Sequence, residues 1–146
     1  MLMNKRILIT GANGFIGSNI IYEFLANSTP VTALVREKSN IDYLKKIKCY
    51  NIIQTDNYLD PIVIRKLSMS KPEYIVHCAW SNNQLKDTKN LIKILELAKN
   101  INCKGFITIG SYKEYGQLEK NLSEDTICNP KNIYGISKNE FYILNK

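Results

Sequence analysis

The strongest constraint on the fold of this chain is a short apolar run that leads directly into three evenly spaced glycines. Residues 7–9 read Ile-Leu-Ile, and residues 10–17 read Thr-Gly-Ala-Asn-Gly-Phe-Ile-Gly, which gives a G-x-x-G-x-x-G pattern. An amphipathic stretch follows the third glycine. This order predicts a buried strand, a tight turn and a helix that begins within the glycine segment.

The glycine segment has the properties of a phosphate-binding turn. Gly11 can adopt backbone angles that other residues disfavour, and Gly17 lets the following helix pack closely on the sheet. The N-terminus of that helix offers N–H groups and the positive end of the helix dipole to an anion. The spacing differs by one residue from the G-x-G-x-x-G dinucleotide fingerprint, so the alternative interpretation is a strand-to-helix turn that binds nothing.

Strand and helix patterns alternate along the rest of the chain, with short connections between them. Strands are predicted at residues 5–10, 31–36, 50–55, 74–78 and 105–109. Helices are predicted after the glycine turn, after residue 39, and at residues 61–69, 84–100 and 132–146. The alternation is typical of an α/β fold with a parallel sheet covered on both faces. Right-handed crossovers give a doubly wound, Rossmann-type sheet of order 3-2-1-4-5, as one domain over residues 1–146.

Capping residues and apolar stripes locate the helices more closely. Ser39 is predicted to cap a short helix, and Asp60 with Pro61 has the form of an N-cap followed by proline at the first helical position. The first helix is expected to bury Ile16, Ile20, Ile21, Phe24 and Leu25. The longest helix is expected to bury Leu85, Thr88, Leu91, Ile92, Leu95 and Ala98, which recur with a 3.6-residue period.

Composition and charge exclude several classes of protein. The formal net charge is +7, but the lysines are scattered and no basic block is interleaved with aromatic residues, so no nucleic-acid partner is expected. No apolar run approaches the roughly 18–20 residues of a membrane span, and no secretory signal precedes the first strand. The four cysteines form no C-x-x-C pair, which predicts reduced thiols in a cytoplasmic protein without a metal site.

A second group of motifs lies in the last third of the chain. Tyr134 and Lys138 form a Y-x-x-x-K pair on a predicted helix, where residues four apart share one face. A phenol is a poor base at neutral pH, and a nearby ammonium stabilises its charged form. Ser111 follows a predicted strand and can donate a hydrogen bond to a substrate oxygen. The three residues suit hydride transfer at a carbinol or ketone, with Tyr134 moving the proton and Ser111 polarising the oxygen.

The glycine turn, Ser111 and the Y-x-x-x-K pair, in this order, resemble the extended short-chain dehydrogenase/reductases. More narrowly, the chain is similar to the NAD-dependent epimerase/dehydratase family, which acts on nucleotide sugars. The resemblance implies a nucleotide-sugar substrate and, as a hypothesis, a homodimer. It covers the first half of such an enzyme, so the smaller substrate-binding lobe is expected to be absent from residues 1–146. The residues implied to bind the cofactor pyrophosphate are Gly11, Asn13, Gly14, Phe15, Ile16 and Gly17.

The resemblance also bears on the choice of cofactor. Members that select NAD usually carry an acid at the end of the second strand, which accepts hydrogen bonds from the ribose hydroxyls. Aligned on the glycine turn, this chain has Val35 there, followed by Arg36 and Glu37. An arginine can stack on adenine and pair with a 2′-phosphate, so NADP is favoured over NAD. In the alternative, Arg36 is a surface cation and Glu37 contacts the ribose of NAD.

Residues at the ends of the third and fourth strands complete the implied cofactor contacts. Asp56 and Asn57 take the place that meets the adenine in the family, although they also have the form of a local turn. Near the nicotinamide ribose the family has small residues, whereas Trp80 stands here. The single histidine, His77, is interpreted as structural, and Asp87 occupies a helix position where the family often has asparagine. The implied contacts around the nicotinamide ribose are Cys78, Ala79, Trp80, Tyr134 and Lys138.

The residues after Ser111 indicate the reaction subclass. Sugar-nucleotide 4,6-dehydratases have an Asp-Glu pair directly after the equivalent residue, whereas Tyr112 and Lys113 stand here. The resemblance therefore favours a 4-keto-sugar reductase or a 4-epimerase over a dehydratase. The alternative is a stand-alone dinucleotide-binding module, or an inactive fragment without turnover.

Overall fold

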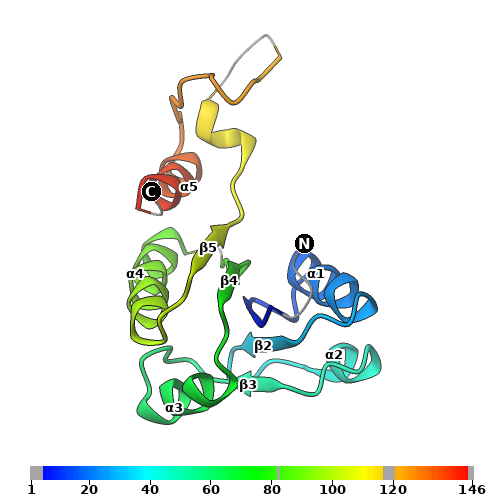
Figure 1. Cartoon of the computed structure of the whole chain (residues 1–146). Coiled ribbons are helices and arrows are strands. Elements are labelled where there is room, and N and C mark those ends of the chain that lie inside the picture. Colours follow the sequence, from blue (N-terminus) through cyan, green and yellow to red (C-terminus); the bar gives the residue numbers. More distant parts are fainter. Residues whose placement is uncertain (1–4, 82, 117–120, 145–146) are drawn as a thin grey trace.

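The computed structural model describes residues 5–81, 83–116 and 121–144, and it has strands and helices in the predicted order (Figure 1). The strands are β1 (Ile7–Thr10), β2 (Val31–Val35), β3 (Ile52–Gln54), β4 (Tyr74–His77) and β5 (Gly105–Thr108). The helices are α1 (Phe15–Ala26), α2 (Asp42–Lys46), α3 (Pro61–Ser70), α4 (Gln84–Asn100) and α5 (Ile133–Leu144), with a short 3-10 helix, η1, at Tyr112–Tyr115. The last helix was predicted to include residues 145 and 146, which lie outside the described residues.

The strands form one parallel sheet of order β3-β2-β1-β4-β5, which confirms the predicted order. β1 lies at the centre, where Ile7 pairs with Val31 of β2 on one side and with Tyr74 of β4 on the other. The chain order reverses between β1 and β4, so the connections that leave these two strands run in opposite directions. In sheets of this kind a crevice for ligands opens at the carboxyl ends of the strands, at the point of reversal.

Alternate residues of the central strand enter two cores, one on each face of the sheet. Ile7 and Ile9 pack with Ile21 of α1 and Leu44 of α2. Leu8, which lies between them, belongs to the opposite core, built from side chains of α3, α4 and α5. Figure 1 shows α4 and α5 on the same side of β4 and β5. No helix within the described residues is long and apolar enough to cross a bilayer.

The helix caps agree with the prediction at α3 and differ from it at α2. The Asp60 carboxylate accepts a hydrogen bond from the backbone N–H of Ile62 at 2.7 Å, as expected for a cap before Pro61. Ser39 does not cap α2, which corrects the prediction. Asn40 instead accepts from the backbone N–H of the first helical residue through its Oδ1 at 2.7 Å. An asparagine side chain reaches the N–H two residues later, which is the Asx-turn geometry.

Helix α4 has the predicted bounds but presents a different face to the sheet. Leu85 and Ile92, which were predicted to be buried, are 68% and 55% exposed. The buried residues are Asp87, Leu91, Ile94 and Leu97. A prediction based on apolar periodicity leaves Asp87 out of the buried face. A carboxylate that accepts hydrogen bonds from nearby donors can nevertheless be buried. On α1, Ile16 is likewise 45% exposed, because Gly17 and Ser18 face the core there.

Candidate functional site

The glycine segment forms a tight turn between β1 and α1. Gly11 has φ +62°, a conformation that favours glycine, and an added Cβ would lie 2.6 Å from the backbone nitrogen of Ala79. Both the backbone conformation and the lack of space therefore disfavour a side chain at this position. Gly14 is the N-cap of α1, and its N–H donates to the Gly11 carbonyl at 2.9 Å. Because no side-chain hydrogen bond caps α1, the N–H groups of its first turn can donate to an anion.

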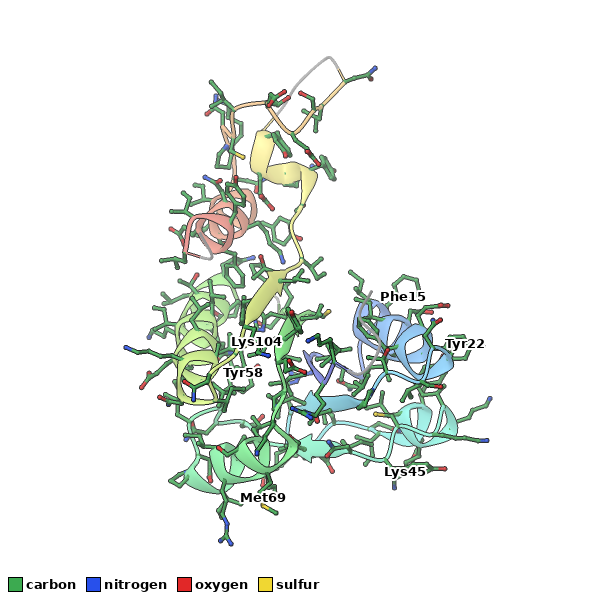
Figure 2. The ribbon with its side chains drawn as sticks, viewed as in Figure 1. Phe15, Tyr22, Lys45, Tyr58, Met69 and Lys104 are labelled. Atoms are coloured by element: carbon green, nitrogen blue, oxygen red, sulfur yellow. The ribbon has the colours of Figure 1, made fainter. Side chains whose placement is uncertain are left out.

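A cleft of about 210 Å³ opens beside this turn, between the residues that follow β1, β2 and β4. Its place is the point where the strand order reverses. The predicted cofactor contacts that line it are Gly11, Asn13, Gly14, Arg36, Cys78, Ala79 and Trp80. The predicted contacts that do not line it are Phe15, Ile16, Gly17, Asp56, Asn57, Tyr134 and Lys138. Phe15 lies at the exposed start of α1 and is 86% exposed (Figure 2).

Polar residues of α4 also line the cleft, and the sequence analysis missed them. Lys86 and Asn90 lie one helical turn apart, beside Asp87, near the start of the helix that follows β4. Ser81 lines the cleft from the loop before this helix. The same four-residue spacing that groups Tyr134 with its lysine could have indicated Lys86 and Asn90. The signal was overlooked because both residues also have the character of a solvated helix face.

Tyr58 is a further cleft residue that the sequence analysis missed. It comes from the loop after β3, where its sequence neighbours give little signal beyond an aromatic residue close to Asp56. Burial raises the pKa of Tyr58 to about 12; the charges of Asp87 and Asp56 act in the same direction and Arg36 acts against it. The phenol is therefore neutral at physiological pH and can serve the cleft as a hydrogen-bond donor.

A second hollow, of about 310 Å³, lies at the end of β2. It is lined by Arg36, Lys38, Ser39, Asp56 and Lys86, which bring together three cations and one carboxylate. The Ser39 Oγ is buried and has no hydrogen-bond partner within the described residues. The three cations of the hollow can therefore supply positive charge to a small anion.

The residues at the end of β3 form the local turn that was considered for them. The Asn57 Oδ1 accepts from the backbone N–H of Leu59 at 3.2 Å. The Asp56 Oδ1 accepts from the backbone N–H of Glu37 at 3.4 Å, which links the loop after β3 to the end of β2. A contact of either side chain with adenine stays a prediction.

His77 and Cys78, at the end of β4, are buried or half-buried and are not suited to ionise. The His77 Nδ1 lies 2.7 Å from Thr10 Oγ1, in a hydrogen bond between neighbouring strands. Burial lowers the pKa of His77 to about 4, and the charge of Lys138 adds to this effect. Burial raises the pKa of the Cys78 thiol to about 11, against a smaller opposing effect of Lys138. This bonding agrees with the structural role predicted for His77.

Asp87 organises the loop between β4 and α4. Its Oδ2 accepts from the backbone N–H of Ser81 at 3.0 Å, and its Oδ1 accepts from Ser81 Oγ at 2.9 Å. Asp87 is only 5% exposed and also lines the cleft. Asp87, at the helix position where the family often has asparagine, therefore fixes the loop that forms one wall of the cleft.

Ser111 is the N-cap of η1, within a capping box. Its Oγ accepts from the backbone N–H of Lys113 at 3.3 Å, and its own backbone N–H donates to the Glu114 carboxylate at 2.5 Å. The hydroxyl proton of Ser111 is not used by the cap, since the oxygen is the acceptor there. The short 3-10 helix therefore fixes the position of Ser111 at the end of the β5 connection.

Helix α5 places the Y-x-x-x-K pair against Trp80, in the loop that follows β4. The Lys138 Nζ donates to the Ile109 carbonyl at 2.8 Å and lies 3.8 Å from the centroid of the Trp80 ring. The Tyr134 ring meets the same indole edge-on, with centroids 5.4 Å apart. Both members of the pair therefore contact a side chain of the cleft wall, although neither lines the cleft itself.

The segment of Ser111 and the helix of Tyr134 pack against each other. Gly135 has no room for a side chain, because an added Cβ would meet the Lys113 carbonyl of η1. The three predicted catalytic residues thus lie at two segments that pack against each other, and α5 contacts Trp80 of the cleft wall. This arrangement can bind a phosphate-bearing ligand and can present a hydroxyl, a phenol and an ammonium near it.

A sequence model of the NAD dependent epimerase/dehydratase family matches residues 7–146. The chain belongs to this family. Family membership accounts for the order of the glycine turn, Ser111 and the Y-x-x-x-K pair, and the resemblance drawn from the sequence is confirmed.

Individual members of the epimerase/dehydratase family resemble the chain over nearly its whole length. It is 29% identical to dTDP-6-deoxy-L-talose 4-dehydrogenase (NAD(+)) of Aggregatibacter actinomycetemcomitans, over 91% of this chain and 51% of the relative. It is 31% identical to GDP-6-deoxy-D-talose 4-dehydrogenase of the same organism, over 97% of this chain and 48% of the relative. The chain spans about half the length of these curated relatives.

A solved structure of another family member has the same fold. ADP-L-glycero-D-manno-heptose-6-epimerase of Helicobacter pylori matches with a TM-score of 0.71 and 27% sequence identity. The match covers 98% of this chain and 51% of that protein. The Rossmann-type prediction is confirmed by this likeness and by the strand order.

Proposed function

We propose that this chain carries the dinucleotide-binding and proton-transfer residues of a nucleotide-sugar 4-keto reductase or 4-epimerase. The observation that carries the proposal is the Gly11 turn, which opens an anion-binding helix N-terminus onto the cleft at the β1–β4 reversal. The turn brings the uncapped start of α1 to the cleft, where its backbone N–H groups can donate to a diphosphate. The residues present therefore fit a nicotinamide dinucleotide.

The proposed chemistry uses the residues that α5 and η1 hold in place. A bound nicotinamide supplies a carbon that accepts or gives a hydride at the sugar C4. Tyr134 moves the proton of the C4 oxygen, and the Lys138 ammonium favours the phenolate that does so. The Ser111 hydroxyl donates a hydrogen bond to the same oxygen and so polarises the carbonyl. Each role follows from the residue type and its place in the fold.

The choice between reduction or epimerisation and dehydration rests on the residues after Ser111. Tyr112 is 63% exposed and Lys113 carries a cation, so neither offers the acid pair that expels water in 4,6-dehydratases. Both relatives are named as 6-deoxytalose 4-dehydrogenases, and a 4-dehydrogenase interconverts a hydroxyl and a ketone at that carbon. We infer the same oxidation-level change for the substrate of this chain, a nucleotide-linked 4-keto sugar or its alcohol.

We propose NADP as the preferred cofactor. Arg36 and Lys38 line the hollow at the end of β2 together with Lys86. Such a set suits a 2′-phosphate, whereas an NAD-selective site needs an acid to accept from the ribose hydroxyls. Asp56 lies in the same hollow and is the residue that would instead favour NAD.

A thermal-shift titration tests the binding proposal. A ligand that binds only the native state raises the melting temperature by mass action. We expect NADPH to raise it more than NADH, and Arg36→Ala to remove the difference. Arg65→Ala is the matched control, because it removes an exposed arginine from α3, away from the cleft. If neither cofactor shifts the melting temperature, the glycine turn does not bind a dinucleotide in this chain and the proposal fails.

Turnover is a separate measurement from binding. NADPH oxidation is followed at 340 nm with a nucleotide-linked 4-keto sugar, for the wild-type chain and for Tyr134→Phe. Oxidation that needs both substrate and Tyr134 supports the reductase. Cofactor binding without oxidation, and without 4-epimerisation of a UDP-hexose, favours the second candidate, a dinucleotide-binding module without turnover.

A further inference from the structure

Trp80, the single tryptophan of the chain, contacts two parts of the candidate site, the cofactor cleft and helix α5. It lies in the loop after β4, next to Ala79, and lines the cleft together with Arg36. Its indole also reaches α5. A residue with one surface on the cleft and the other on the proposed proton-transfer residues can link them.

The contacts of the indole enclose the Lys138 side chain. The ammonium lies 3.8 Å from the Trp80 ring centroid and donates to the Ile109 carbonyl at 2.8 Å. Phe141, about two helical turns after Tyr134, packs edge-on against the same indole, with ring centroids 5.1 Å apart. Lys138 is only 6% exposed. Its ammonium thus has an aromatic face and a carbonyl oxygen as close partners within the described residues.

A buried ammonium with so few partners needs a compensating interaction. Burial lowers the pKa of Lys138. Glu114 from η1, Asp87 from α4 and the thiol of Cys78 after β4 act in the opposite direction. His77 of β4 feels the same ammonium, since the charge of Lys138 lowers its pKa. Among the described residues, the ion pairs are those of Glu73 with Lys5 and Lys104, so the carboxylates of Glu114 and Asp87 act on Lys138 from beyond ion-pair distance.

We propose that Trp80 is a positioning residue that holds the Lys138 ammonium and the Tyr134 ring in one arrangement beside the cofactor cleft. The negative face of the indole attracts the cation, and the edge-on contact fixes the orientation of the phenol ring. A cation over an aromatic face keeps its charge more readily than one beside an aliphatic side chain of similar size. The inference rests on the proposed function of Tyr134 and Lys138, but its test does not need a bound cofactor.

The first test is the titration of Lys138 by NMR in a chain labelled with ¹³C-lysine, with Lys138→Met used to assign the signal. Trp80→Leu keeps the bulk of the site and removes the aromatic face. We expect the titration midpoint of Lys138 to fall in Trp80→Leu and to recover in part in Trp80→Phe. Exposed lysines in the same spectra are internal controls and should titrate unchanged. Equal midpoints in the wild type, Trp80→Phe and Trp80→Leu would overturn the proposal.

Tyr50→Leu is the matched control variant, because Tyr50 is 80% exposed and lies outside the cleft. It removes an aromatic ring of similar size and should leave the Lys138 signal unmoved. A shift of the same size in Tyr50→Leu would also contradict the proposal, since the effect would then not depend on the indole.

A second measurement uses the native side chains and so does not depend on the folding of a Trp80 variant. As the sole tryptophan, Trp80 reports its own surroundings by fluorescence. We expect its emission to change with pH as Lys138 loses its proton, and this change to be absent in Lys138→Met. A pH-independent emission in both proteins would overturn the proposal.

The failure of this inference is distinguishable from the failure of the proposed function. If the titration midpoint of Lys138 depends on Trp80 but NADPH gives no thermal shift, Trp80 positions the ammonium as proposed and the binding proposal is wrong. If NADPH binds but Trp80→Leu leaves the Lys138 titration unchanged, the binding proposal stands and Trp80 only fills space.

Discussion

The Glu114 carboxylate accepts a hydrogen bond from the backbone N–H of Ser111 at 2.5 Å. A buried acid three positions later in the chain therefore holds Ser111, the residue proposed to polarise the substrate. Glu114 is 7% exposed, and its charge also acts on Lys138. The capping box therefore connects the short η1 helix to α5. A carboxylate in this position has consequences for both stability and geometry.

We expect Glu114→Ala to lower the free energy of unfolding by about 1–2 kcal/mol, because the Ser111 N–H loses its acceptor and the cap is broken. Glu114→Gln should lose less, since an amide oxygen can still accept. Urea unfolding followed by circular dichroism measures the difference. Glu96→Ala on the exposed face of α4 is the control and should stay within about 0.5 kcal/mol of the wild type. A loss in Glu114→Ala no larger than in this control contradicts the role of the cap.

Gly11→Ala should destabilise the chain and abolish dinucleotide binding together. The methyl group would meet the Ala79 backbone at 2.6 Å while the residue is held at φ +62°, and strained backbone of this kind costs about 1–3 kcal/mol. Gly14→Ala is the matched control, because Gly14 has φ −78° and its nearest neighbour, the Gly11 carbonyl oxygen, is 3.2 Å away. Unfolding in urea and the thermal shift with NADPH measure both effects. Equal losses in the two variants would show that the Gly11 conformation has no special role.

The elements of this fold were predictable because their signals are local. The apolar run of β1 and the Asp60 cap with Pro61 each depend on residues within a few positions of one another, and both are confirmed. Strand order then follows from the alternation and from the handedness of crossovers. The hydrogen bond of Asn40 to the first N–H of α2 was not predicted by such signals, since the side chains of Ser39 and Asn40 can both accept from a nearby N–H.

The contacts of the candidate site were less predictable because they join distant positions. Asp87 is buried against Ser81, and no apolar periodicity indicates that a carboxylate belongs to the core face of α4. Trp80 reaches Lys138, 58 positions later, and the motif alone did not show which residue fills the space over the ammonium. Residue types and their order therefore identified the family, whereas the partners of each group required the three-dimensional fold.

Asp87 and Ser81 should be energetically coupled. The Asp87 carboxylate accepts from both the backbone N–H and the hydroxyl of Ser81, and only the second bond is lost in Ser81→Ala. A double-mutant cycle with Ser81→Ala and Asp87→Ala should therefore give a coupling energy of about 1 kcal/mol. Ser81→Ala combined with Glu96→Ala is the control pair and should be additive. Additivity in the Asp87 cycle would show that the loop is held by other contacts.

The stability of the chain should fall as the pH is lowered from 7 to 5, and His77 should be the main cause. The pKa of His77 in the folded chain is about 4, below its usual value of 6.5, so the unfolded chain binds the proton more tightly. Stability is therefore highest above pH 6.5 and is lost progressively as the pH falls toward 4. The loss between pH 7 and pH 5 should be about 2 kcal/mol for a shift of this size.

Urea unfolding at several pH values, in the wild type and in His77→Gln, measures this dependence. His77 is the single histidine of the chain, so the slope between pH 7 and pH 5 has no other histidine contribution. We expect the slope to be much smaller in His77→Gln, whatever the absolute stability of that variant, because a glutamine does not titrate and can still bond to Thr10 Oγ1. Thr126→Ala, in the exposed loop before α5, is a control that should keep the wild-type slope. The same slope in His77→Gln as in the wild type would mean that protonation of His77 does not destabilise the folded chain.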